Sequence, residues 1–244
     1  MRELHELSEQ HRIIVIGGQA VAFWYRQLSA LGHLPNREIL PLTSKDIDFR
    51  AARQTVQRAA VLLGGEARLP TIDDHTPSTG LVLFVDRDGH RRQIDFVDAP
   101  YGLTARDVVD TAQHVLLADE HGDVPAVIIH PERLMESRIH NIVGLGQRSA
   151  HALRQARAAI ACAGAFSALI LESREMEESK RVRAVLRLNE RIYRFCRRPI
   201  GRAFVRTTGM DPFDAVLFEH HMLPAKFRTV RYPQMQTSLA QLQR

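Results

Sequence analysis

The sequence predicts an α+β protein, in which a mixed β-sheet with flanking helices is followed by an α-helical C-terminal domain. Within residues 1–130, short apolar and β-branched runs alternate with helical patterns. Residues 131–244 carry apolar residues at helical spacing and no convincing strand. We therefore expect two domains, 1–130 and 131–244, and the 45% hydrophobic content of the 244 residues is ample for their cores.

Two glycines separate the first expected strand from the first expected helix. Residues 13–16 are apolar and β-branched, Gly17 and Gly18 interrupt them, and residues 19–31 follow helical periodicity. Further strands are expected at 46–49, 81–85, 93–97, 115–117 and 126–129, and a second helix at 52–63. Asp86 and Asp88 are typical turn residues, and the Asp-Gly pair at 88–89 predicts a hairpin.

Expected helices fill the second half of the chain. Pro131 fits the first position of a helix, and longer apolar patterns follow over 152–170 and 182–196. Residues 1–130 have a net charge of −5 and residues 131–244 a net charge of +10. Acidic groups attract metal ions and basic groups attract phosphates. Only three of the 33 cations are Lys, so an Arg-rich composition also accounts for part of this bias.

Composition excludes several classes of protein. Two cysteines, Cys162 and Cys196, are too few for a disulfide framework or a four-thiolate zinc site, and the twelve histidines show no zinc-binding spacing. No stretch approaches the ~18 uncharged apolar residues of a membrane span, and the first residues lack the pattern of a signal peptide. We expect a reduced, soluble, cytoplasmic protein with no membrane partner.

Three carboxylates lie on expected strands. Asp46 and Asp48 are two residues apart and share one face of their strand, and Asp95 lies between apolar residues on a later strand. We expect all three to point away from the core. Such a cluster repels itself unless cations neutralise it, and hard oxygen ligands suit Mg²⁺ or Mn²⁺.

The glycine pair adds a phosphate-binding element. At a connection from strand to helix, Gly17 and Gly18 let a phosphate approach the backbone closely, and the helix N-terminus offers unpaired N–H groups. A lone Gly-Gly or Asp-x-Asp is common and has ordinary structural explanations. The ordered set of Gly17-Gly18, Asp46-x-Asp48 and Asp95 is a much more specific pattern than either part alone. Metal ions shared by such carboxylates can activate an attacking hydroxyl and stabilise a leaving pyrophosphate.

This ordered set resembles the DNA polymerase beta-type nucleotidyltransferase superfamily over about residues 11–140. The matching segments are Gly17-Gly18, Asp46-Ile47-Asp48-Phe49 and Ile94-Asp95-Phe96. The chain is most similar to small bacterial and archaeal members, including abortive-infection-type toxins with a helical C-terminal region. It departs from the family in having Gly18 where Ser is frequent, and in a longer segment before Asp46, which loop 33–43 can absorb.

The resemblance implies transfer of a nucleoside monophosphate from an NTP, with Mg²⁺ or Mn²⁺. Asp46 and Asp48 would hold both metal ions, and Asp95 would hold the catalytic ion and help deprotonate the acceptor hydroxyl. Gly17 and Gly18 would cradle the triphosphate.

Two further segments resemble these proteins. Thr43-Ser44-Lys45 precedes the Asp pair and adds Ser44 and Lys45 as nucleotide-binding residues. The segment 129–134 leads into the helix where the family often places a basic residue that touches the nucleotide. Arg138 is the first candidate for that residue and Arg133 the second.

A basic stripe occupies one expected helix. Five arginines recur three or four residues apart, along a face about 22 Å long at ~1.5 Å per residue: Arg183, Arg187, Arg191, Arg194 and Arg198. Such a stripe could follow a nucleic-acid backbone, with each guanidinium forking onto phosphates. A solvated amphipathic face explains it equally well, and Tyr193 and Phe195 are too few to support base stacking.

The leading interpretation is a metal-dependent nucleotidyltransferase with the 3′ end of a tRNA as the first choice of acceptor. Such a protein would be a toxin with a neutralising antitoxin partner. The alternatives are a small-molecule or protein acceptor, a non-catalytic nucleotide- or RNA-binding module of the same fold, and a basic interaction protein with incidental Asp residues. Salt-sensitive tRNA binding would favour a tRNA acceptor. Stabilisation of the protein by Mg²⁺ with NTP would exclude a basic interaction protein with incidental Asp residues.

Overall fold

The structure is a computed structural model that describes residues 13–35, 47–71, 73–74, 78–86, 88–117 and 123–243. The chain divides into two compact units, Met1–Ala22 with Pro41–Ser137 and Phe23–Leu40 with Arg138–Arg244. Helices α2 (Gly17–Ala30) and α5 (Pro131–Gly144) each contribute residues to both units. The predicted α+β class is confirmed, and the predicted boundary near residue 130 stays a prediction.

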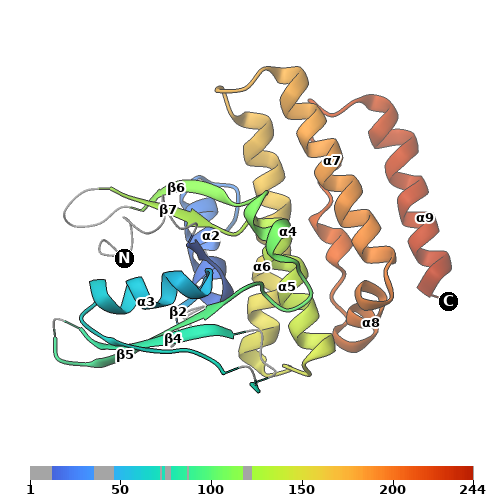
Figure 1. The fold of residues 1–244 in the computed structure, drawn as a ribbon. Coiled ribbons are helices and arrows are strands. Elements are labelled where there is room, and N and C mark those ends of the chain that lie inside the picture. Colours follow the sequence, from blue (N-terminus) through green and yellow to red (C-terminus); the bar gives the residue numbers. More distant parts are fainter. Residues whose placement is uncertain are drawn as a thin grey trace. The chain divides into compact units, whose positions relative to one another are not determined.

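A seven-stranded mixed sheet forms the first unit (Figure 1). Its strands are β1 (Ile14–Val15), β2 (Ile47–Arg50), β3 (Glu66–Arg68), β4 (Ser78–Val85), β5 (Arg91–Val97), β6 (Gln113–Leu117) and β7 (Val124–Ile128). They lie in the order β3-β4-β5-β2-β1-β7-β6. The pairs β2–β5 and β1–β7 are parallel, and the other neighbours are antiparallel.

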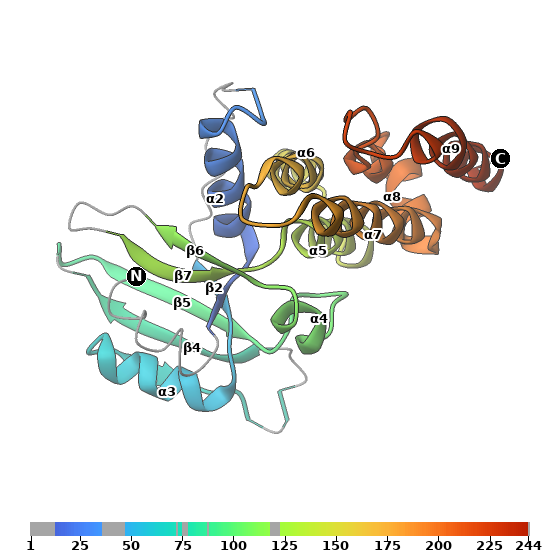
Figure 2. The ribbon, with the colours of Figure 1, turned by 90° about the horizontal axis from the view of Figure 1, so that it is seen from above.

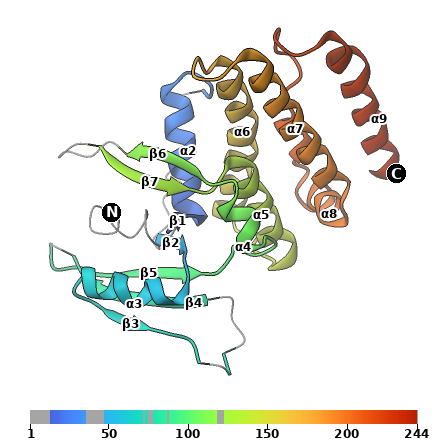
Figure 3. The ribbon, with the colours of Figure 1, turned by 45° about the horizontal axis from the view of Figure 1, so that its top comes forward.

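One face of this sheet packs against helix α3 (Arg53–Leu62), as Figure 3 shows. Phe49 of β2 and Phe96 of β5 are 1% and 0% exposed, and their rings stack with centroids 5.7 Å apart. Gly80 pairs with Phe96 and meets Val56 of α3, where an added Cβ would lie 3.0 Å from Cγ1 of Val56. The phenylalanine face is therefore the face that α3 covers.

Most of the expected elements of the first unit are present. Both hairpins form, β4 with β5 and β6 with β7. Helix α2 begins at Gly17, two residues earlier than predicted, because both glycines enter its first turn and the Ala20 N–H donates to the Ile16 carbonyl (3.3 Å). Strand β3 and helix α4 (Ala105–Val109) were not predicted, because they are three and five residues long and too short for a periodic signal.

Helices make up the second unit, and the described residues 131–243 form no strand, as predicted. Their bounds are α6 (Ala150–Glu172), α7 (Glu178–Arg197), α8 (Pro199–Thr208), α9 (Tyr232–Gln243), a 3₁₀ turn η1 (Pro212–Ala215) and a π-helical turn η2 (Phe227–Arg231). Helices α6 and α7 lie side by side, and α7 also contacts α8 and α9 (Figure 2).

Buried polar side chains fix the connections between these helices. Asn189 of α7 is fully buried, its Nδ2 donates to the Leu217 carbonyl (2.7 Å), and its Oδ1 accepts from the Leu217 N–H (3.1 Å). Arg181 Nη1 donates to the carbonyls of Leu171 (2.7 Å) and Ser173 (2.6 Å) at the end of α6. The Arg181 bonds satisfy carbonyls at the end of α6, and the Asn189 bonds satisfy both backbone groups of Leu217 in the segment after η1.

Trp24 and the two cysteines are buried among apolar side chains. Trp24 is 3% exposed, and its ring meets Phe166 of α6 edge-on at 5.2 Å. Cys162 and Cys196 are buried and unpaired. Burial raises the pKa of the Cys162 thiol to about 12. Both cysteines therefore act as small apolar residues.

No stretch near the length of a membrane span is expected from the sequence, but helix α6 is long and apolar enough to cross a membrane by length and composition alone. However, 61% of its most apolar window is buried inside the structure, as in the core helix of a soluble protein. The cytoplasmic location stays a prediction.

Candidate metal and nucleotide site

Two of the expected carboxylates lie side by side on neighbouring strands. Asp48 of β2 and Asp95 of β5 are direct partners in the parallel register. Because their neighbours Phe49 and Phe96 are partners on the face that α3 covers, Asp48 and Asp95 share the opposite face. Both side chains are half-buried. Asp48 and Asp95 thus lie on the face opposite the buried phenylalanines, and the predicted site roles of the three carboxylates stay predictions.

The start of α2 lies against Asp48. Gly17 has φ +67°, and a Cβ at this position would overlap the Asp48 carboxylate, with Cγ only 2.9 Å away. The Ile16 N–H donates to the Asp48 carbonyl (3.1 Å), which holds the two segments together. Gly17 and Gly18 are both buried in the first turn of α2. The helix N-terminus and its N–H groups therefore begin beside a carboxylate, where the sequence predicted a phosphate cradle.

Asp95 is held by a neighbouring amide that sequence analysis did not identify. Gln93 lies two residues earlier on β5 and so shares the face of Asp95. Its Nε2 donates to both carboxylate oxygens, at 2.9 Å to Oδ1 and 3.1 Å to Oδ2. The alternation of Gln93, Ile94 and Asp95 placed this amide on the carboxylate face, but it did not reveal the hydrogen bonds.

A cation on the same face was also missed. Arg50 follows Asp48 by two residues on β2, and its side chain is 14% exposed. Its Nε donates to the Asp98 carbonyl (3.0 Å), and its Nη2 lies 3.5 Å from Asp98 Oδ1. The sequence alternation Asp48-Phe49-Arg50 contained this signal. The structure thus places one guanidinium on the strand face that carries the two carboxylates.

Three of the predicted site residues lie outside the described residues. These are Asp46, Ser44 and Lys45. Their roles stay predictions.

The two candidates for a nucleotide-binding arginine have different surroundings. Arg133 lies in the first unit, where Nη1 binds Glu136 Oε2 (2.8 Å) and Nη2 lies 3.6 Å from Asp107 Oδ1. These carboxylates already engage its guanidinium. Arg138 lies in the second unit and donates from Nη1 to Gln155 Oε1 (3.2 Å). The nucleotide-binding role of Arg138 stays a prediction.

The basic stripe is mostly at the surface of α7. Arg183, Arg187, Arg194 and Arg198 are exposed, and Arg191 is half-buried. Glu190 interrupts the stripe, because it lies 3.7 Å from Arg194 and accepts from Arg231 Nη2 with both oxygens at 2.9 Å. Tyr193 and Phe195 are 5% and 1% exposed, so neither ring is presented for base stacking.

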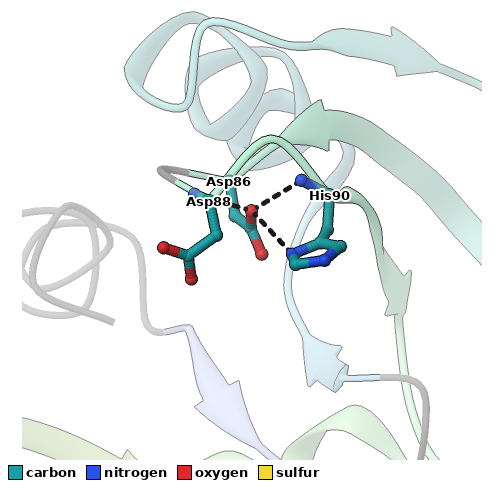
Figure 4. Close-up of side chains that lie close together, drawn as sticks. All are labelled: Asp86, Asp88 and His90. Carbon is teal, nitrogen blue, oxygen red and sulfur yellow. Dashed lines mark hydrogen bonds and ion pairs between the residues drawn. The ribbon is translucent and has the colours of Figure 1, made fainter.

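A second group of potential metal ligands lies in the β4–β5 hairpin (Figure 4). Ligand atoms of Asp86, Asp88 and His90 all lie within 4.8 Å of one another. Asp86 already serves the turn, since its Oδ1 accepts from the N–H groups of Asp88 (3.0 Å) and His90 (2.8 Å). Arg92 Nε donates to Oδ2 at 2.7 Å and, with the His90 N–H, lowers the pKa of the Asp86 carboxyl. The predicted turn role of Asp86 is confirmed.

Comparisons with known proteins return one solved structure. The chain is similar to an antigenic nucleotidyltransferase-like protein from Paracoccidioides brasiliensis, with 11% sequence identity and a TM-score of 0.41. The match covers 70% of this chain and 84% of that chain. No protein-family model matches the sequence, and no curated protein matches it.

Proposed function

We propose that this protein is a metal-dependent nucleotidyltransferase that moves a nucleoside monophosphate from an NTP to a hydroxyl acceptor. The observation that carries the proposal is the register pair of Asp48 and Asp95 on parallel strands, with Asp48 against Gly17 at the start of α2. Carboxylates can hold the metal ions for a reaction between a triphosphate and a hydroxyl, and a helix N-terminus favours binding of the phosphates.

The donor chemistry of this face fits a hard divalent cation. Asp48 and Asp95 are oxygen donors of like charge on adjacent strands, and like charges in such positions destabilise a sheet. A divalent ion would remove that cost, and carboxylate oxygens suit Mg²⁺ or Mn²⁺. Asp46 is two residues before Asp48 in the sequence, and we assign it to the same donor set.

The proposed roles follow from these positions. Asp46 and Asp48 would hold the metal ions, and Asp95 would hold the catalytic ion and help remove the proton of the acceptor hydroxyl. The new bond from that hydroxyl oxygen to the α-phosphorus would replace the bond to pyrophosphate, which leaves. The bound metal supplies Lewis-acid stabilisation of the attacking and leaving oxygens. Gly17 and Gly18 begin α2, where N–H groups favour anions, and in this proposal their backbone would lie against the phosphates. Ser44, Lys45 and Arg138 bind the triphosphate in this proposal.

The proposed acceptor is the 3′ end of a tRNA. Support comes from α7, where three of its four stripe arginines are exposed and can contact phosphates along a backbone. Arg198 is also exposed but lies one residue beyond the end of α7, so the helical stripe is shorter than expected. If the added nucleotide blocks use of the tRNA in translation, the protein acts as a toxin, and we extend the proposal to that role with a neutralising antitoxin partner.

Label transfer tests the proposal directly. Each α-labelled NTP is incubated with Mg²⁺, total tRNA and the full chain, alongside Asp48→Asn, Asp95→Asn and the control Asp110→Asn. Asp110 is a matched control because it is an exposed carboxylate of the same unit and belongs to neither group of potential metal ligands. Transfer by the wild type and Asp110→Asn, with loss in both site variants, supports the enzyme. Pyrophosphate release without labelled tRNA would indicate that the acceptor is a small molecule or a protein. Nucleotide binding without pyrophosphate release would overturn the enzyme and leave a binding module.

A further inference from the structure

We propose that Gln93 sets the cation preference of this site, because its amide occupies the chelating edge of the Asp95 carboxylate and so favours Mg²⁺ or Mn²⁺ over Ca²⁺. The inference rests on the proposed function, in which Asp95 is a metal ligand. It concerns a residue that belongs to none of the motifs shared with the resembling family.

The geometry places one nitrogen between two oxygens. Gln93 Nε2 lies 2.9 Å from Asp95 Oδ1 and 3.1 Å from Oδ2, so it is almost equidistant from them. A donor in that position faces the open edge of the carboxylate, between the oxygens. A cation that chelates both oxygens would lie at the same edge. The amide and a chelated cation therefore exclude each other.

Divalent cations differ in their need for that edge. Ca²⁺ takes six to eight oxygen ligands at about 2.3–2.6 Å and readily accepts carboxylates through both oxygens. Mg²⁺ requires near-octahedral geometry at about 2.0–2.1 Å, which a single oxygen from each carboxylate satisfies. Each carboxylate offers about four lone-pair positions, so the outer position of either oxygen stays open while Gln93 holds the edge.

The strand holds the amide in place without adding charge. Gln93 and Asp95 alternate onto the same face of β5, so a side chain of this length reaches the carboxylate. The bond is charge-assisted and stronger than one between neutral groups. Chelation of Ca²⁺ requires loss of this bond, whereas single-oxygen ligation of Mg²⁺ or Mn²⁺ preserves it.

Metal binding without nucleotide tests the inference independently of turnover. Free Mn²⁺ is followed by electron paramagnetic resonance in the presence of the full chain, and bound Mn²⁺ is then displaced by Mg²⁺ or Ca²⁺. The test variant is Gln93→Met, which keeps the length of the side chain and removes the donor. Gln113→Met is the matched control, because Gln113 lies on β6 of the same sheet and its amide binds the Thr111 carbonyl instead.

We expect Gln93→Met to bind Ca²⁺ about tenfold more tightly relative to Mg²⁺, as loss of one charge-assisted hydrogen bond predicts. Gln113→Met should keep the wild-type ratio. Gln93→Glu provides a second variant of the same size and should tighten binding of both cations through its added charge. An unchanged ratio of Ca²⁺ to Mg²⁺ affinity in Gln93→Met would overturn the inference.

The outcomes separate this inference from the proposed function. Mn²⁺ binding that Asp95→Asn does not weaken would remove Asp95 as a ligand and overturn the inference together with the metal site. A changed cation ratio in a protein that transfers no nucleotide would support the role of Gln93 and contradict only the enzymatic activity. Circular dichroism of each variant confirms that the sheet is folded, which the exposed position of Gln93 favours.

Discussion

Gly17 and Asp48 are so close that the glycine has no room for a side chain. A Cβ at Gly17 would overlap Oδ2 of Asp48 and would lie 2.9 Å from Cγ and 3.0 Å from Cβ. The backbone of Gly17 also has φ +67°, which residues with a side chain rarely adopt. Two independent constraints therefore require glycine at position 17. One is the positive φ of its backbone, and the other is the steric overlap that a side chain would have with Asp48.

Substitution of Gly17 by alanine should separate these two constraints. We expect Gly17→Ala to destabilise the protein by about 2–4 kcal/mol, because conformational strain adds to overlap with Asp48. Gly64→Ala is the matched control, since Gly64 has φ +60° and no atom within 4 Å of an added Cβ. Its expected cost is about 1–2 kcal/mol. Urea unfolding measures the stability of both variants. Equal losses of stability in Gly17→Ala and Gly64→Ala would show that the Asp48 side chain moves aside at no energetic cost.

Neutralisation of one carboxylate should matter for stability mainly when metal is present. Without divalent ions, Asp95→Asn should change stability by less than about 1 kcal/mol, because relief of repulsion from Asp48 is offset by weakening of the charge-assisted bond from Gln93. With Mg²⁺ at ten times its Kd, the wild type should gain about 1.4 kcal/mol and the variant much less. Thermal unfolding in EDTA and in Mg²⁺ measures both effects. An unchanged Tm of the wild-type protein on addition of Mg²⁺ or Mn²⁺ would contradict the proposed metal site.

An ion pair attaches η2 to α7. Arg231 Nη2 lies 2.9 Å from both oxygens of Glu190, and its guanidinium lies over the Tyr193 ring, 5.4 Å from the centroid. Because both side chains are partly exposed, we expect a coupling energy of only about 0.5–1 kcal/mol. A double-mutant cycle with Glu190→Gln and Arg231→Ala measures it. Arg194→Ala is the control, since Arg194 is 70% exposed and 3.7 Å from Glu190, and its coupling to Glu190 should be near zero.

Burial of Cys162 should make stability depend on alkaline pH. Burial raises the pKa of this thiol from 9.0 to about 12, so the folded state disfavours the thiolate. The contribution of Cys162 is complete below pH 9 and is lost as pH rises from about 9 towards 12, since the unfolded chain releases its proton first. Urea unfolding between pH 8 and 11 measures this loss. Cys162→Ala should show a smaller decline over the same range, and an identical decline would assign the effect to other groups.

The sequence predicted the elements of the site better than its contacts. The alternation around Asp48 and Asp95 placed each residue on a strand and on one face, because side-chain direction in a strand follows from period two. Their direct pairing depends on the order and register of β2 and β5, which no local pattern encodes. The hydrogen bonds of Gln93 and the Asp98 contact of Arg50 were missed for related reasons, since each depends on side-chain geometry.

Short elements escaped prediction for a different reason. Strand β3 has three residues, of which two are charged, so its place at the edge of the sheet leaves little apolar pattern. Helix α4 has five residues and is defined by its cap, where Thr104 Oγ1 accepts from the Asp107 N–H and the Asp107 carboxylate accepts from the Thr104 N–H. A capping box of this kind was visible in the sequence as Thr-x-x-Asp.

The contact between Trp24 and Phe166 has a consequence for the order of events during synthesis. Trp24 leaves the ribosome 142 residues before Phe166, against which its ring packs in the second unit. At a translation rate of roughly 5–20 residues per second, Phe166 is synthesised on the order of ten seconds after Trp24. During that interval, a nascent chain carries an apolar helix segment with no native surface to cover it. Chaperone binding to the early part of this chain is therefore expected to persist until α6 has been translated.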